Sequence, residues 1–392
     1  MQKQIGSMVC SALRPRALIP RYFAKTTLEI MQRSAALLQK MSRAPEDRAA
    51  WAELQNKIEA FSLFEHVDLE IKMGDRARPS LQELVLSASR HDVYRAVWMM
   101  EGIGHYYAES HRDPQLSVTG LLSEETTKGL PASSFVPLHT GMGISFAEWV
   151  LELVCKRPAD CTGLLRSFTQ LCRNNSRSGY GGSTFEALGL VARNLYPHLM
   201  ERIDSALSED RELLAYFWHG VGRGIYFAPA NAPPFRNAPW RGLEMCVCEP
   251  THKLGRSNAV SGFAWALTLV NIRDPQIMEV FLKYHGNQMA EDDAFADGVR
   301  SAMIIWKHAT AAACHLNLIQ EHALRSSDPH FMSLWQTFFK RPCEDALNDL
   351  RVDRCRNAVS NLFRYQPVSR AGESSSQPAR RVRSRNPMAL RP

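Results

Sequence analysis

Apolar residues in this chain recur at the spacing of helix faces, and short glycine motifs interrupt that pattern at nearly even intervals. The motif glycines are Gly102/Gly104, Gly141/Gly143, Gly179/Gly181, Gly220/Gly222, Gly262 and Gly298. Successive motifs lie 36 to 42 residues apart, counted from the first glycine of each. A repeat of this length is typical of stacked helical hairpins. The pattern predicts an all-α fold of tandem hairpins of about 40 residues that forms an α-solenoid or a closed α/α ring.

The glycines in these apolar segments need a physical reason. Inside a helix, glycine is about 1 kcal/mol less favourable than alanine. A cost repeated in six segments indicates a steric requirement rather than chance. We expect the bare Cα atoms either to let neighbouring helices approach closely or to start helices from tight turns.

The sequence before the repeats is also mainly helical in pattern. Apolar positions over 26–41 fall on one helix face, and Pro45 separates this stretch from a second helix over 46–61. Residues 64–72 alternate apolar and polar side chains, which predicts either a short strand or a turn that leads into a helix over 80–88.

These patterns divide the chain into four parts. Residues 1–85 form an N-terminal helical segment, and residues 86–327 form the helical repeat domain with the glycine motifs. Residues 328–365 are predicted to be C-terminal capping helices. Residues 366–392 are rich in Ser, Pro and Arg and poor in apolar residues, so we expect a disordered tail.

The distribution of charged residues along the sequence limits the classes of molecule that the protein is expected to bind. The tail holds six arginines and one acidic residue, and it therefore carries most of the formal charge of +7. The rest of the chain is near neutral, so we expect no specific nucleic-acid partner. Solvated disorder, an acidic protein partner, contact with nucleic acid and peripheral contact with an anionic membrane all stay open for the tail.

Composition and motifs exclude several kinds of chemistry. No apolar run reaches the roughly 20 residues that span a bilayer. With nine cysteines and no signal-like segment, we expect a cytoplasmic protein with reduced thiols. Phosphate-binding, dinucleotide and hydrolase motifs are absent. Cys246 and Cys248 are too closely spaced for a usual zinc pair, so we expect neither a metal nor a cofactor.

Among the polar residues, Arg223 is the strongest candidate for a functional site, because it lies in the apolar, glycine-rich sequence Gly-Val-Gly-Arg-Gly-Ile-Tyr-Phe. A buried guanidinium must be paired or must bind an anion. One interpretation is a fork for a ligand carboxylate or phosphate. The alternative is an internal ion pair with Glu101, Glu186 or Asp297.

Further candidates lie in or beside the motifs. A general acid/base site would draw on His105, His139, His219, Glu101, Glu109 and Glu148. The alternative is that these histidines are hydrogen-bonded packing residues. The motif aromatics, Tyr226 among them, either fill the core or line an apolar tunnel. The predicted ligand-binding set is Arg223, His139, His219, Glu101 and Tyr226.

Three motifs carry a family resemblance. They are Leu-His-Thr-Gly-Met-Gly-Ile-Ser-Phe-Ala from 138, Gly-Tyr-Gly-Gly-Ser-Thr-Phe from 179, and His-Gly-Val-Gly-Arg-Gly-Ile-Tyr-Phe from 219. In this order they resemble a bacterial family of unknown function encoded beside enediyne polyketide synthases, over roughly residues 90–310. Ser178 and Tyr226 depart from that family, whose relatives tend to have an acidic residue and Trp there.

The resemblance implies an accessory protein of specialised-metabolite biosynthesis that holds an apolar or anionic intermediate. The resemblance identifies no catalytic residue in this chain. Two other classes stay open, namely a protein–protein interaction scaffold that uses a concave helical face, and an enzyme that uses the His/Glu set for proton transfer.

Overall fold

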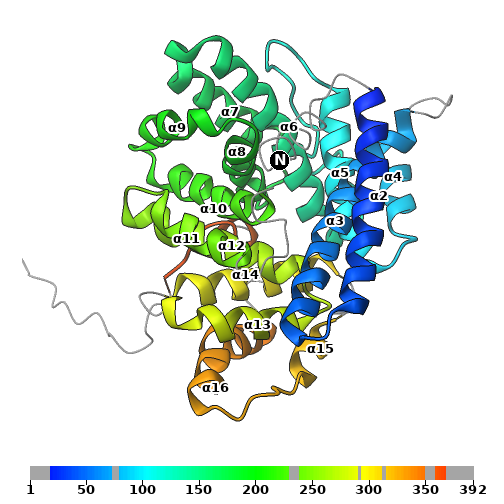
Figure 1. The fold of residues 1–392 in the computed structure, drawn as a ribbon. Helices are drawn as coiled ribbons and strands as arrows, with labels where there is room; N and C mark the ends of the chain where they lie inside the picture. Colours follow the sequence, from blue (N-terminus) through cyan, green and yellow to red (C-terminus); the bar gives the residue numbers. More distant parts are fainter. Residues whose placement is uncertain are drawn as a thin grey trace, which may run out of the picture.

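The fold consists of packed helices. The computed structural model describes residues 18–72, 79–228, 238–289, 293–310, 315–348 and 358–367. Within these ranges the backbone forms helices and turns, with one isolated bridge between Leu122 and Ser176. The all-α prediction is confirmed (Figure 1). The tail expected to be disordered lies outside the described residues, except for its first two positions.

Six glycine-containing helices, here called the Gly helices, form the centre of the protein. They are α5 (Val93–Ser110), α6 (Phe135–Lys156), α8 (Gly181–Leu195), α10 (Arg211–Phe227), α12 (Lys253–Val270) and α14 (Ala294–Ala309). Each of them packs against the next one along the chain, and α14 also contacts α6 and the short helix η1 (Ala132–Ser134).

Shorter helices follow most of the Gly helices. They are α7 (Cys161–Asn175), α9 (Met200–Leu207), α11 (Ala238–Cys248), α13 (Pro275–His285) and α15 (Leu316–Glu321), with η2 (Pro158–Asp160), η3 (Pro197–Leu199) and η5 (Gly286–Met289) in the connections. The hairpin pattern is absent after α5, where turns fill the sequence up to η1. The first repeat thus differs from the later ones.

The first two N-terminal helices extend further than the sequence predicts, whereas the third matches the helix predicted over 80–88. They are α2 (Leu18–Met41), α3 (Pro45–Lys72) and α4 (Leu81–Ala88). Neither the strand nor the turn considered for 64–72 is present, because α3 continues through these residues. A Cβ atom on Gly102 would lie 2.3 Å from the carbonyl oxygen of Phe64, so α3 packs tightly on α5 there. This tertiary packing outweighs the local alternation. Helix α4 begins with a capping box between Ser80 and Glu83.

The C-terminal part is mainly helical in its described residues. It contains α16 (Pro329–Trp335), the π-helical turn η6 (Gln336–Lys340), α17 (Arg341–Asn348) and α19 (Ala358–Asn361). Helix α17 packs on α14, and α19 packs on α8. One hydrophobic core extends from Ala49 to Phe363 among the described residues.

The motif glycines lie where helix backbones touch, which confirms the close-approach prediction for five of the six motifs. A Cβ on Gly104 would lie 2.1 Å from the carbonyl oxygen of Leu138. A Cβ on Gly298 would lie 2.2 Å from that of Ser261. Distances this short leave no room for a methyl group.

The motif at Gly179 and Gly181 is different. Gly179 has φ +89° in the turn before α8, a backbone region that favours glycine. A Cβ on Gly181 would meet nothing nearer than the Phe185 ring, at 3.4 Å. The glycines of α8 that touch other backbone are Gly182 and Gly189 instead.

Candidate functional site

Arg223 lies buried between two carboxylates. Its Nη2 donates to Glu101 Oε1 on α5, and its Nη1 donates to Glu186 Oε2 on α8 at 3.3 Å. Arg223 is 2% exposed, Glu101 is 6% exposed and Glu186 is fully buried. The ion-pair alternative therefore describes Arg223 better than the ligand fork, because both Nη groups already have protein partners.

His219 completes this group one helical turn before Arg223. Its Nδ1–H donates to Glu186 Oε1 at 3.0 Å, and the side chain is fully buried. We call Glu101, Glu186, His219 and Arg223 the ion cluster. Trp265 of α12 covers it, with its ring centroid 5.1 Å from the Arg223 guanidinium carbon.

The glycine contacts fall on the ion cluster itself. A Cβ on Gly141 would lie 1.8 Å from the carbonyl oxygen of Glu101. A Cβ on Gly220 would lie 1.9 Å from the carbonyl oxygen of Glu186, and a Cβ on Gly262 would lie 1.9 Å from that of His219. The backbone of three cluster residues is thus held against a glycine of the neighbouring helix.

The charges of the ion cluster are unequal, because two carboxylates share one permanent cation. Burial, the largest influence, and the neighbouring Glu186 raise the pKa of Glu101 above its usual range, although Arg223 acts to lower it. Burial also raises the pKa of Glu186, but Arg223 and His219 outweigh burial and the net shift is downward. Glu186 therefore stays ionised more strongly, and Glu101 is the carboxyl group of the cluster that takes up a proton more readily.

Three nitrogen atoms in and beside the ion cluster have no hydrogen-bond partner among the described residues. They are Arg223 Nε, His219 Nε2 and Trp265 Nε1. A buried polar atom without a partner usually costs about 1–3 kcal/mol. Asp297, the other carboxylate considered for Arg223, instead accepts a hydrogen bond from Ser261 Oγ at 3.2 Å.

His139 belongs to a different network. Its Nδ1–H donates to the Phe135 carbonyl at 2.7 Å, and its Nε2 accepts from the Arg177 N–H at 2.9 Å. The Tyr180 ring stacks on it at 5.2 Å. Burial lowers the pKa of His139 to about 4. Nδ1 is bonded within α6 and Nε2 holds the loop before α8, so His139 is a neutral packing residue here.

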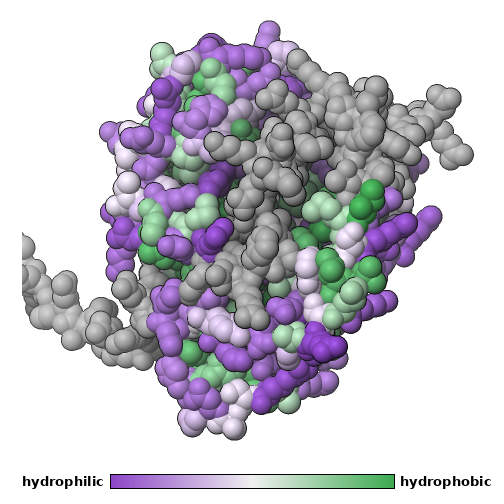
Figure 2. Space-filling model, viewed as in Figure 1, coloured by the Kyte–Doolittle hydropathy of each residue, from purple (hydrophilic) through white to green (hydrophobic). Residues whose placement is uncertain are grey.

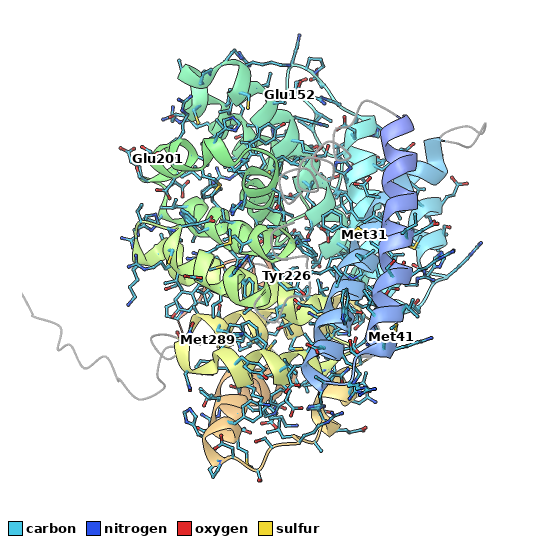
Figure 3. The ribbon with its side chains drawn as sticks, in the orientation of Figure 1. Met31, Met41, Glu152, Glu201, Tyr226 and Met289 are labelled. Atoms are coloured by element: carbon cyan, nitrogen blue, oxygen red, sulfur yellow. The ribbon has the colours of Figure 1, made fainter. Side chains whose placement is uncertain are left out.

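Tyr226 also lies away from the ion cluster, near the middle of the molecule (Figure 3). Its hydroxyl oxygen accepts from Asn271 Nδ2 at 2.8 Å, and Lys57 Nζ of α3 lies 4.0 Å from its ring centroid. Burial raises the pKa of Tyr226 well above its usual value. These contacts join α3 to α10 and α12.

The rest of the acid/base set is dispersed. His105 lies 3.2 Å from Glu148 Oε2 in a partly buried pair between α5 and α6. Glu109 accepts from Trp149 Nε1 at 2.6 Å. Of the predicted ligand-binding residues, the structure brings together Glu101, His219 and Arg223 only.

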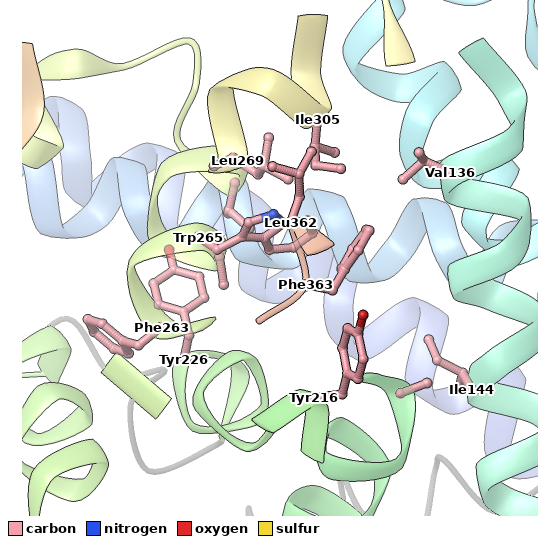
Figure 4. Packing of buried hydrophobic residues seen from close by; sticks show 14 of the residues in the cluster. Val136, Ile144, Tyr216, Tyr226, Phe263, Trp265, Leu269, Ile305, Leu362 and Phe363 are labelled. Atoms are coloured by element: carbon pink, nitrogen blue, oxygen red, sulfur yellow. The ribbon is translucent and has the colours of Figure 1, made fainter. Parts of the chain in front are cut away.

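Sequence reasoning missed the segment formed by residues 358–367, here called the C-terminal segment. Leu362 and Phe363 are buried among side chains of α6, α10, α12 and α14 (Figure 4). The ring centroids of Phe363 and Trp265 are 5.9 Å apart, so the C-terminal segment packs on Trp265, the residue that covers the ion cluster. The apolar pattern of Val359, Leu362 and Phe363 just before a polar tail was the available signal.

Fold and site together define an all-helical protein whose central helices touch through glycine around a buried ion cluster. No family model matches the chain, and comparisons with curated proteins and solved structures found no match. The resemblance to the enediyne-associated family therefore stays a prediction. In the described ranges, no group of three His, Cys, Asp or Glu side chains is arranged for a metal. Across the same ranges, no helix combines the length and apolar character of a membrane span.

Proposed function

We propose that this protein is an interaction scaffold whose Gly helices bind a polypeptide segment of a partner in the way that they hold the C-terminal segment. The observation that carries this proposal is the recognition of main-chain N–H groups in the C-terminal segment. The Tyr365 N–H donates to Asn258 Oδ1 at 2.7 Å, and the Gln366 N–H donates to Asp297 Oδ2 at 3.3 Å. Main-chain hydrogen bonds combined with side-chain pockets are the usual way in which proteins bind extended peptides.

The acceptor Asn258 is oriented for this contact. It is fully buried, and its Nδ2 donates to the Leu254 carbonyl of its own helix at 2.8 Å. The carboxamide oxygen is therefore directed to the segment. At the other end, Ser360 Oγ donates to the Gly179 carbonyl at 2.8 Å and accepts from the Gly182 N–H at 3.1 Å.

Side-chain contacts add selectivity to the backbone contacts. Phe363 is fully buried beside Trp265, and the Arg364 guanidinium carbon lies 5.6 Å from the Tyr216 ring centroid. An aromatic–Arg–aromatic sequence therefore matches this surface. We propose that such sequences in a partner protein use the same contacts.

We further propose that the Gly helices close into an α/α ring, with the C-terminal segment at one opening. The contacts of α14 with both α12 and α6 support closure. So do the Tyr94 and Trp306 rings, which lie 6.2 Å apart between α5 and α14. The Tyr94 hydroxyl also donates to the Val270 carbonyl at the end of α12 at 2.9 Å.

A labelled peptide of residues 358–367, added to the full-length protein, tests the scaffold. In the parent protein, the tethered segment competes at high effective concentration, so we expect weak uptake measured by fluorescence anisotropy. Phe363→Ala in the protein removes an apolar anchor worth about 3 kcal/mol, so we expect roughly tenfold tighter uptake or more.

The matched control is the same peptide with Phe363→Ala, which should not bind the variant. Thermal unfolding establishes that the variant is folded. Uptake by the folded variant no better than that of the parent would contradict the proposal.

A second candidate is the ligand-holding accessory role in specialised-metabolite biosynthesis. It is favoured by the apolar surroundings of Leu362 and Phe363, since an apolar chain would fit where these side chains lie (Figure 4). Native mass spectrometry of protein extracted from its producing cell should then reveal a bound small molecule. An empty protein under gentle conditions would count against this role.

A cytoplasmic location also stays a proposal. It is supported by the free thiols of the described residues, which are Cys155, Cys161, Cys172, Cys246, Cys248 and Cys343.

A further inference from the structure

Helix α2 presents an apolar stripe to solvent. Its members are Ile30, Leu37 and Met41, with 59%, 59% and 68% of their surface exposed. Positions that differ by seven or eleven residues fall on the same face of a helix. We call these three residues the α2 stripe.

The opposite face of α2 already has a partner. Ala35 is 1% exposed and packs with Leu54 and Ile58 of α3, with Leu28 and Met31 beside them. The α2 stripe therefore faces away from the protein core. Figure 2 shows hydrophobic residues gathered on the right-hand side of the molecule, where α2 runs in Figure 1. Met31 and Met41 mark this stretch of the helix in Figure 3.

Basic residues accompany the α2 stripe. Arg33 and Lys40 are exposed on α2, and Arg43 is exposed just after it. In the sequence, residues 1–41 contain seven Lys or Arg and one Glu, whereas residues 42–365 contain more acidic than basic residues. The exposed cations Arg33, Lys40 and Arg43 therefore lie on or directly after the helix that carries the α2 stripe.

Apolar and basic side chains on the same helix allow a choice between two binding partners, a second copy of α2 and an anionic membrane surface. A second copy of α2 would bring two positively charged helices together, which is unfavourable. An anionic bilayer surface offers negative headgroups for Arg33 and Lys40, and an acyl boundary for the apolar side chains between them. Surface-bound amphipathic helices have a basic polar face and an apolar face of this kind.

We propose that the outer face of α2 binds an anionic lipid surface, with the α2 stripe inserted at the headgroup boundary. The helix would lie on the membrane and would not cross it. This surface is independent of the peptide contacts proposed for the Gly helices, because it lies on the outside of α3.

Co-sedimentation of the full-length protein with vesicles tests this inference. We expect binding to vesicles of equal phosphatidylserine and phosphatidylcholine, and much weaker binding to phosphatidylcholine alone. The double variant Leu37→Glu/Met41→Glu should lower the bound fraction roughly tenfold or more, since it removes apolar area and adds negative charge. The control Met332→Glu changes an exposed apolar residue of α16 and should bind like the parent.

A second variant guards against misfolding. Arg33→Glu/Lys40→Glu leaves the apolar residues in place and should also weaken binding to the mixed vesicles. Three results would overturn the inference. The first is parent-like binding by both folded α2 variants. The second is binding abolished only by Arg380→Gln/Arg381→Gln/Arg383→Gln in the tail. The third is a concentration-dependent dimer lost in Leu37→Glu/Met41→Glu.

Discussion

Gly189 of α8 and Gly220 of α10 face each other's helix backbone. A Cβ on Gly189 would lie 1.8 Å from the Phe217 carbonyl oxygen, and a Cβ on Gly220 would lie 1.9 Å from that of Glu186. Each glycine therefore removes the side chain that would hold the other helix away. The contact is reciprocal, so the spacing of the two helices depends on both residues.

Gly220→Ala should destabilise the protein, because the added methyl group meets rigid backbone. Overpacking of this kind typically costs about 1–3 kcal/mol and sometimes more. Gly181→Ala is the matched control at the start of α8, where space is available, and it should be neutral or slightly stabilising. Urea unfolding of the two variants measures the difference. Equal stability would mean that the helices separate at no cost.

Neutralising the two carboxylates of the ion cluster should have unequal effects. Burial raises the pKa of Glu101, whereas Arg223 and His219 bring the pKa of Glu186 below its usual range. Glu101→Gln mimics a form that the site accepts, so it should cost less than Glu186→Gln. Removing a firm partner from a buried ion pair costs about 3–5 kcal/mol. Urea unfolding at neutral pH compares them, and a larger loss for Glu101→Gln would reverse the assignment.

His139 should make the fold sensitive to acid. Burial lowers its pKa from 6.5 to about 4. The unfolded chain therefore binds this proton first, and stability is full above pH 6.5 and declines as the pH falls toward 4. The contribution amounts to about 3 kcal/mol.

The variant His139→Gln isolates this group. It should be less stable than the parent at neutral pH but should lose less stability between pH 6.5 and pH 4. Urea midpoints across this range give the measurement. Parallel curves for parent and variant would exclude a role for His139 in the acid response.

Asp297 should act in the opposite direction. Burial raises its pKa from 3.8 to about 7. The folded state therefore holds this proton more tightly, and the stability it provides is full below pH 3.8 and is lost as the pH rises to 7.

Asp297→Asn removes that titration. The stability of the variant relative to the parent should rise between pH 4 and pH 8, by up to about 4 kcal/mol. Unfolding curves at the two ends of this range test the expectation. A relative stability that stays constant with pH would show that Asp297 does not titrate in this window.

Sequence reasoning succeeded where a residue type has one physical explanation. Glycines inside apolar helices predict close backbone approach, and Gly104 and Gly141 make it. Gly179, with φ +89° in the turn before α8, instead fits the other expectation, that a motif glycine starts a helix from a tight turn. Gly189 was missed because it falls outside the spacing of 36 to 42 residues that defines the motifs.

The site was partly predictable for similar reasons. The cost of burying a guanidinium indicates that Arg223 has carboxylate partners. Which carboxylates they are depends on tertiary structure, since Glu101 lies 122 residues away. His139 shares the motif context of His219, but it faces the loop before α8. The C-terminal segment could not be placed, because its contacts depend on side chains of several helices.

The glycines beside the ion cluster have an electrostatic consequence. Gly141, Gly220 and Gly262 lie against the carbonyl groups of Glu101, Glu186 and His219. A single methyl group at any of them would move a side chain of the ion cluster relative to Arg223 without altering any charge. Mutations of uncharged residues should therefore shift proton affinities deep inside this protein.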